Sequence, residues 1–174
     1  MHKEAFNMTE TKPEPRSELL VNITVNGSKT SELIPARTLL SEYVREYLFL
    51  TGTHRGCETA KCGACTVLLD GKAVKSCNVL AAQANGHNVT TVEGLDDNGK
   101  LSPIQQSFWD NHGMQCGYCT PGFVIAATAL LNEIPDPTVD EIRFNLAGNI
   151  CRCTGYTKII ESVQDASQRI LKGS

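Results

Sequence analysis

The chain has 174 residues, of which 41% are hydrophobic and 20% are charged, and its net charge is −3. This composition is typical of a folded globular protein, with no sign of the basic patch or stripe of a nucleic-acid binder. Residues 1–16 are polar and contain proline, unlike a secretory signal, and no later stretch approaches the ~20 apolar residues of a transmembrane helix. We therefore expect a cytoplasmic protein with a flexible N-terminal extension, no transmembrane segment and no nucleic-acid partner.

The part of the chain that follows residue 16 alternates between apolar and polar residues, as strands do. We expect strands over residues 20–25 and 29–34 with a tight turn at Asn26-Gly27, a helix from Thr38 to Leu48, a hairpin over residues 65–79 with a turn at Asp70-Gly71, and a strand over residues 88–92. The order hairpin, helix, loop, hairpin and strand suits a β-grasp domain, which we assign to residues 17–95.

Residues 96–174 are predicted to form a second, helical domain with four helices. The start signals are Ser102-Pro103 and Thr120-Pro121, each an N-cap followed by proline, a capping box from Thr138 to Glu141 before residues 139–146, and Thr157 before the last helix. Phe108 and Trp109 are expected to pack inside this bundle. The predicted fold class is therefore α+β, with a β-grasp domain followed by a four-helix domain.

The eight cysteines of the chain fall into two groups of four. The first group is Cys57, Cys62, Cys65 and Cys77, and its spacing, C-x4-C-x2-C with a distant fourth cysteine, is that of a plant-type ferredoxin. The second group is Cys116, Cys119, Cys151 and Cys153, arranged as two close pairs. No cysteine is left over, so the sequence predicts two [2Fe–2S] clusters.

Disulfides and zinc are the competing roles for these cysteines. Disulfides are disfavoured because cytosolic thiols are kept reduced. Zinc is also held by four cysteines, and both Cys62-x2-Cys65 and Cys116-x2-Cys119 fit a zinc knuckle. An additional cysteine upstream favours iron–sulfur for the first group. For the second group zinc remains an alternative, although its Cys-x-Cys pair is unusual for a zinc ribbon.

The residues around both groups suit an anionic cluster. A [2Fe–2S] centre with four thiolates has a formal charge of about −2 when oxidised and about −3 when reduced, so it needs backbone N–H donors nearby. Glycines flank both groups and allow the backbone to approach closely. Each cysteine pair of the second group comes just before a predicted helix, whose partially positive N-terminus favours negative charge.

Three segments resemble the iron–sulfur subunit of the molybdenum hydroxylases, the xanthine dehydrogenase and aerobic carbon monoxide dehydrogenase family. They are Gly56–Thr66 (GCETAKCGACT), Gln115–Gly122 (QCGYCTPG) and Gly148–Tyr156 (GNICRCTGY). The resemblance extends over roughly residues 18–170. One departure is Ala60, which stands where many relatives have glycine, and its small side chain should still fit.

This resemblance implies electron transfer from a molybdopterin centre through both clusters to FAD. The cluster near molybdenum would be held by Cys116, Cys119, Cys151 and Cys153, and the cluster near FAD by Cys57, Cys62, Cys65 and Cys77. Gln115, by default a loop residue that forms hydrogen bonds, would contact the pterin, as would Cys153. The partners implied are a large subunit with molybdopterin, in the form of a cytosine dinucleotide, and a medium subunit with FAD, in a dimer of heterotrimers.

Two other functions are compatible with the cysteine pattern. One is a stand-alone ferredoxin with two clusters, although the weak net charge of −3 offers little electrostatic steering to such a shuttle. The other is an interaction module stabilised by zinc, without a redox role. Within the hydroxylase family the substrate is chosen by the large subunit, and carbon monoxide, an aldehyde or an N-heterocycle is expected. The pattern is slightly more similar to small subunits of the carbon monoxide dehydrogenase type.

Overall fold

The first half of the chain forms a five-stranded sheet with the strand order β2-β1-β5-β3-β4. The structure, a computed structural model, describes residues 17–96 and 99–173, so the expected extension over residues 1–16 lies outside the described residues. The strands are β1 (Glu18–Val25), β2 (Ser28–Pro35), β3 (Thr66–Leu69), β4 (Lys72–Lys75) and β5 (Asn88–Thr90), and the 3-10 turns are η2 (Ser76–Asn78), η3 (Ala81–Ala84) and η4 (Val92–Leu95). Strands β1 and β5 are parallel and all other neighbours are antiparallel, which gives the mixed sheet of a β-grasp domain.

Both predicted hairpin turns are present. The φ angles of Asn26 and Gly27 are 49° and 78°, and those of Asp70 and Gly71 are 47° and 81°. Positive φ at both central residues is characteristic of the type I′ turn, whose twist matches that of the flanking strands. The turns therefore set the register of β1 with β2 and of β3 with β4.

The helix predicted from Thr38 to Leu48 is shorter and differently wound. It consists of α1 (Leu40–Glu42) followed by the π-helical segment η1 (Tyr43–Tyr47). The N-cap is Leu39 and not Thr38, because the carboxylate Oε2 of Glu42 accepts the N–H of Leu39 at 2.9 Å. The N–H of Leu48 donates to the carbonyl of Tyr43 at 3.2 Å, which is the wider hydrogen-bonding pattern of a π turn.

The second hairpin is also shorter than predicted. β4 ends at Lys75, and Cys77 lies in the turn η2 instead of on the strand. Ser76 accounts for this turn, because its N–H and its hydroxyl donate to the carbonyl of Cys65 at 3.3 and 2.7 Å. These bonds bring the fourth cysteine of the first group beside the third. β5 likewise ends at Thr90, earlier than predicted.

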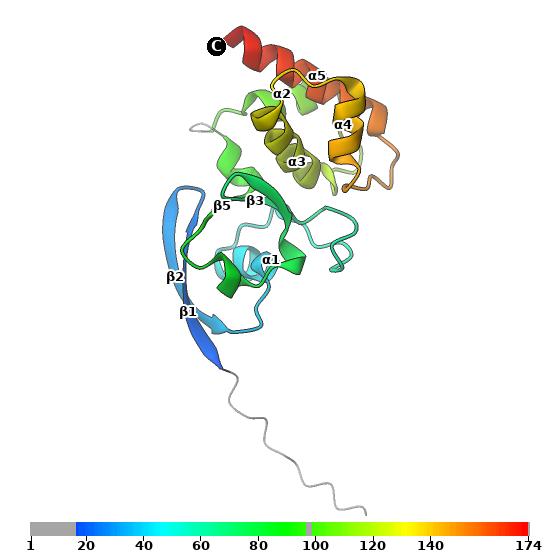
Figure 1. Cartoon of the computed structure of the whole chain (residues 1–174). Helices are drawn as coiled ribbons and strands as arrows, with labels where there is room; N and C mark the ends of the chain where they lie inside the picture. The colour runs from blue at the N-terminus through cyan, green and yellow to red at the C-terminus, as the bar shows by residue number, and fades with distance from the viewer. Residues whose placement is uncertain (1–16, 97–98, 174) are drawn as a thin grey trace, which may run out of the picture.

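The second half of the chain contains the four predicted helices, which gather at one end of the molecule in Figure 1. They are α2 (Pro103–Asp110), α3 (Thr120–Glu133), α4 (Val139–Leu146) and α5 (Tyr156–Gly173). Ser102 is the N-cap of α2, as predicted. The capping box of α4 is also confirmed, since Thr138 N–H donates to Glu141 Oε2 at 2.8 Å and Glu141 N–H donates to Thr138 Oγ1 at 3.3 Å.

Two helices begin one residue earlier than predicted. The N-cap of α3 is Cys119, whose carbonyl accepts the N–H of Phe123 at 3.1 Å. The carbonyl of Gly155 accepts the N–H of Ile159 at 3.1 Å, so α5 starts at Tyr156. A cysteine of the second group is therefore itself part of a helix start.

Each half of the chain has its own hydrophobic core. One core joins the sheet to α1 and η1, and the other fills the space between α2, α3, α4 and α5. Phe108 is buried in the helical core as predicted, but the prediction for Trp109 is wrong, because 65% of its surface is exposed. Adjacent residues of a helix point in different directions, so both could not face the core equally. Within residues 17–96 and 99–173, no helix has the length and apolar character needed to cross a membrane.

Candidate metal centres

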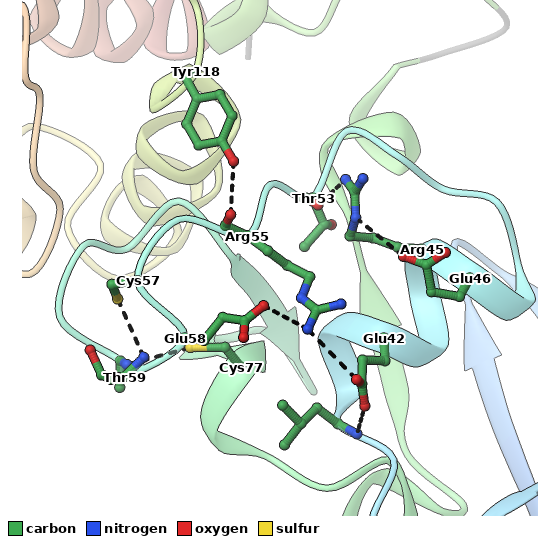
Figure 2. Close-up of polar contacts among 12 residues, drawn as sticks. Glu42, Arg45, Glu46, Thr53, Arg55, Cys57, Glu58, Thr59, Cys77 and Tyr118 are labelled. Carbon is green, nitrogen blue, oxygen red and sulfur yellow. Dashed lines mark hydrogen bonds and ion pairs between the residues drawn. The ribbon is translucent and has the colours of Figure 1, made fainter.

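One loop and one turn bring together the first group of cysteines. Cys57, Cys62 and Cys65 lie on the loop between η1 and β3, and Cys77 lies in η2. The sulfur of Cys57 accepts the N–H of Thr59 at 3.4 Å (Figure 2) and that of Cys62 at 3.3 Å. The sulfur of Cys77 accepts the N–H of Ala60 at 3.4 Å. The side chains of Cys65 and Cys77 are hydrogen-bonding neighbours. The loop thus directs backbone donors at the sulfurs, as an anionic cluster requires.

The loop owes this shape to three residues in the left-handed region. The φ angles of Glu58, Ala60 and Gly63 are 54°, 59° and 76°. Ala60 adopts the conformation that a glycine would adopt without strain, at a cost of about 1–2 kcal/mol. The departure from the family pattern at this position therefore leaves the loop able to donate the Ala60 N–H to Cys77.

The thiols of the first group ionise unequally. Hydrogen bonds from the side chain of Thr59 and from the backbone N–H groups of Cys62 and Thr59 lower the pKa of Cys57 to about 6. Burial raises the pKa of Cys77. Because a metal ligand must be a thiolate, Cys57 is ready to bind iron near neutral pH, whereas Cys77 needs the positive charge of the metal.

The second group is assembled from two separate segments of the chain. Cys116 and Cys119 precede α3, and Cys151 and Cys153 precede α5. Their side chains form pairs across the two segments, Cys116 with Cys153 and Cys119 with Cys151. The sulfur of Cys151 also accepts the N–H of Gly155 at 3.3 Å. The predicted grouping therefore corresponds to neighbouring side chains in space.

Exposure separates the thiols of the second group as well. The N–H of Tyr118 and the side chain of Cys153 lower the pKa of Cys116, which is exposed. Burial, followed by the neighbouring Cys151, raises the pKa of Cys119 to about 12. Each group thus contains one thiol whose pKa is lowered by hydrogen bonds, Cys57 or Cys116, and one whose pKa is raised by burial, Cys77 or Cys119.

Gln115 lies at the exposed side of the second group. A Cβ atom on Gly155 would stand 3.6 Å from Gln115 Nε2 and 3.7 Å from Cys151 Sγ, so Gln115 is close to the cysteine segment before α5. Cys153 is partly exposed beside it, and Cys116 is more exposed. Gln115, Cys116 and Cys153 are thus all at least partly exposed to solvent.

Tyr118 connects the two groups and was not foreseen from the sequence. Its hydroxyl donates to the carbonyl of Arg55 at 2.8 Å, as Figure 2 shows, and its ring stacks on His54 with centroids 4.6 Å apart. His54 Nδ1 also lies 2.7 Å from the carbonyl oxygen of Tyr118. Tyr118 stands inside the Cys116-x2-Cys119 motif, but spacing alone does not indicate which way its ring points.

The side chain of Arg55 is held by two carboxylates beside the first group (Figure 2). Its Nη2 lies 2.6 Å from Glu58 Oε1 and 3.6 Å from Glu42 Oε1. Glu58 belongs to the cysteine loop and Glu42 ends α1, so Arg55 ties that loop to the helix. Its positive charge is already shared between two acidic side chains.

The donor set of each group fits a [2Fe–2S] cluster. All eight cysteines are free thiols, and each group contributes four, arranged as two neighbouring pairs. Four cysteine thiolates hold a [2Fe–2S] cluster, with two serving each iron. Among the described residues, no three Cys, His, Asp or Glu side chains surround a point where a single metal ion could be held.

Comparison with known protein families gives two adjoining matches. Residues 23–91 match the 2Fe-2S iron-sulfur cluster binding domain, and residues 91–164 match the [2Fe-2S] binding domain. Each match contains one complete group of cysteines.

Individual relatives are similar over nearly their whole length. The chain is 47% identical to the nicotine 6-hydroxylase small subunit of Paenarthrobacter nicotinovorans, covering 92% of this chain and 96% of the relative. It is 46% identical to the caffeine dehydrogenase subunit gamma of Pseudomonas sp. (strain CBB1), covering 87% and 92%. Among solved structures, a chain of quinoline 2-oxidoreductase from Pseudomonas putida 86 superposes with a TM-score of 0.86 at 40% identity, covering 90% and 98%.

A longer relative places the same two domains within a larger polypeptide. Aldehyde oxidoreductase from Desulfovibrio gigas superposes with a TM-score of 0.85 at 39% identity, and the match covers 90% of this chain but 18% of that one. The fold and the two cysteine groups therefore define an electron-transfer protein with two [2Fe–2S] binding domains. More narrowly, the chain belongs to the family of small iron–sulfur subunits of the molybdenum hydroxylases.

Proposed function

We propose that this chain carries electrons from a molybdopterin centre in a large partner subunit to FAD in a medium partner subunit. Its bound [2Fe–2S] clusters supply the one-electron carriers. The cluster near molybdenum is held by Cys116, Cys119, Cys151 and Cys153, and the cluster near FAD by Cys57, Cys62, Cys65 and Cys77. Gln115 and Cys153 contact the pterin, which we take to be a cytosine dinucleotide.

Direct contact between the two ligand segments supports this proposal most strongly. The N–H of Ile150, next to Cys151, donates to the carbonyl of Cys62 at 2.9 Å. A ligand of the first group is thus hydrogen-bonded to the residue that directly precedes a ligand of the second group. Such a contact keeps the two groups at a constant separation, as a relay of electrons requires.

The exposed surface near Gln115 supports the assignment of the second group to the molybdenum side. Cys116 is exposed there, and Trp109 and Met114 expose 65% and 37% of their surfaces nearby in the sequence. Large apolar side chains on a surface are common where another protein binds. We propose a dimer of heterotrimers in the cytoplasm, in which residues 17–95 and 96–174 act as the two domains of this subunit.

The substrate of the complex is selected by the large subunit. Among carbon monoxide, aldehydes and N-heterocycles, we propose an N-heterocycle. The relatives described above are named for nicotine, caffeine and quinoline, all of which contain a nitrogen heterocycle. An aldehyde is the second candidate, because the Desulfovibrio gigas relative is an aldehyde oxidoreductase.

The decisive experiment is to tag this chain in its native host and measure the metals and flavin that are purified with it. We expect molybdenum, flavin and about four irons per chain, together with two larger subunits. Iron without molybdenum or partners would show a stand-alone ferredoxin instead. Zinc in place of iron would overturn the redox function altogether.

A further inference from the structure

Lys75 is a partly buried cation that has neutral hydrogen-bond partners. Its Nζ donates to Asn149 Oδ1 at 2.8 Å and to Thr66 Oγ1 at 3.0 Å. Within the described residues no carboxylate forms an ion pair with Lys75, in contrast to Arg55, whose guanidinium is paired with Glu42 and Glu58. The positive charge of Lys75 is therefore not neutralised by a neighbouring acidic side chain.

Lys75 lies next to two of the segments that carry the first group of cysteines. Lys75 stands opposite Thr66 in the register of β3 with β4, and Thr66 directly follows Cys65. Lys75 also ends the strand that leads into η2, where Cys77 lies. The ammonium group thus donates to the residue that follows the third cysteine, and its own strand leads to the fourth cysteine.

Asn149 holds Lys75 from the helical domain. This residue is 4% exposed, and its Nδ2 donates to the carbonyl of Gly63 at 3.1 Å, so it binds the cysteine loop as well as Lys75. The fit is tight, since a Cβ atom on Gly63 would lie 2.6 Å from Asn149 Cγ. Cys151, a ligand of the second group, follows two positions later.

We propose that Lys75, positioned by Asn149, is the counter-cation that makes the first cluster the better electron acceptor of the two. This inference rests on the proposed function, because it requires a cluster in each group. The step concerned is the transfer of one electron from the second cluster to the first, with no bond made or broken and no proton moved. A nearby positive charge stabilises the additional negative charge of the reduced first cluster, and partial burial strengthens that interaction.

The test is a redox titration of the purified complex, following each cluster by its electron paramagnetic resonance signal. Lys75→Met should lower the one-electron equilibrium constant for reduction of the first cluster by about tenfold, equivalent to about 59 mV, and leave the second cluster unchanged. Lys72→Met is the matched control, because Lys72 is an exposed lysine on the same strand, and it should shift neither cluster. Lys75→Arg, which keeps the charge, should restore most of the wild-type value.

Asn149→Ala tests the positioning role. It should shift the first cluster in the same direction as Lys75→Met but by less, and the double variant should shift no further than Lys75→Met alone. If Lys75→Met fails to assemble both clusters, Lys75→Gln keeps hydrogen-bonding capacity without charge and should produce the same shift.

Two results would separate the inference from the proposed function. Wild-type complex with about four irons per chain, combined with unchanged potentials in Lys75→Met or Lys75→Gln, would overturn the role of Lys75 and leave the proposed function standing. Wild-type complex without iron would overturn the proposed function, and this inference with it. Equal shifts in Lys75→Met and Lys72→Met would show a general surface-charge effect and would also overturn the inference.

Discussion

The two cysteine groups present the same set of thiols by different structural means. The first group is mostly local, because three of its members lie within the loop from Cys57 to Cys65 and the fourth is reached by a turn. The second group joins two segments that are far apart in the sequence, each leading into a helix. A local loop needs unusual backbone angles to direct its N–H groups at sulfur, as at Glu58 and Ala60. The segments of the second group also use positive φ angles, 84° at Gly117 and 58° at Thr154, but each segment then continues into a helix.

The two sites should therefore depend on the metal to different extents. The loop of the first group has no regular secondary structure, and three of its backbone N–H groups, those of Thr59, Ala60 and Cys62, donate to cysteine sulfurs. The helices that carry the second group pack around their own core, which includes Phe123 and Ile159. We therefore expect loss of iron to disorder the first site more than the second.

The largest expected effect comes from removing one ligand of either cluster. Cys62→Ser and Cys153→Ser should each lower the iron content from about four to about two per chain and leave the absorption spectrum of the other cluster intact. Cys62→Ser should make the loop over residues 51–65 sensitive to protease. Cys153→Ser should create no such sensitive segment, because α3 and α5 keep their core. Metal analysis and limited proteolysis of the full complex check both points.

Reduction of the flavin by substrate gives a second measurement on Cys153→Ser. Cys153→Ser should stop substrate-driven reduction of the flavin, since the proposed path begins at the second cluster. Normal flavin reduction in this variant would contradict the assignment of the second group. Equal protease sensitivity of the two variants would contradict the proposed difference between the sites.

Sequence spacing describes the first group more directly than the second. Its three-cysteine motif lies in one segment, so spacing alone specifies which residues meet. The pairing of Cys116 with Cys153 and of Cys119 with Cys151 depends on how α3 and α5 pack, which spacing does not describe. The turns at Asn26-Gly27 and Asp70-Gly71 were predictable because positive φ angles strongly favour such residues.

Contacts between the domains were beyond sequence reasoning. Tyr118 and Asn149 lie inside recognisable motifs, yet their partners Arg55, Gly63 and Lys75 are distant in the chain. Two helix starts were displaced because the carbonyls of Cys119 and Gly155, which precede the expected starts, accept the first helical hydrogen bonds. Long-range packing decides these features, and a single sequence contains no direct signal for it.

A glycine beside a cysteine in each site allows a matched comparison of packing. Gly63 and Gly117 each directly follow a cysteine and have φ angles of 76° and 84°. A Cβ atom on Gly63 would lie 2.6 Å from the carbonyl oxygen of Gly148, whereas one on Gly117 would meet nothing within 4 Å. Gly117→Ala should therefore cost only the backbone strain of about 1–2 kcal/mol, and Gly63→Ala about 3 kcal/mol or more.

The free energy of unfolding of the full chain, measured with denaturant, checks this difference. Iron content should also fall in Gly63→Ala, because the clash separates the cysteine loop from the segment before α5. Equal costs for the two variants would mean that the domains are not closely packed at Gly63.

The smallest expected effect concerns one exposed carboxylate in each domain. The backbone N–H of Asn88, followed by His87, lowers the pKa of Asp70, and hydrogen bonds from Arg169, followed by Gln106, lower that of Asp110. A lowered pKa in the folded state stabilises the fold above the unfolded pKa of about 3.9, and this contribution is lost as the pH falls through the folded pKa. Asp70→Asn and Asp110→Asn should thus each reduce the unfolding midpoint slightly at pH of about 7.

The pH dependence distinguishes this electrostatic effect from a loss of packing. Each difference from wild type should shrink as the pH falls below the unfolded pKa of about 3.9 and through the lower folded pKa, because the protonated wild-type carboxylate resembles the amide. Asp140→Asn is a suitable control, because Asp140 pairs with Arg143 within one turn of α4 and joins no second element. In contrast, Asp70 joins the turn between β3 and β4 to β5, and Asp110 joins α2 to α5. A difference that stays constant with pH would show that the amide disturbs the structure and that charge is not responsible.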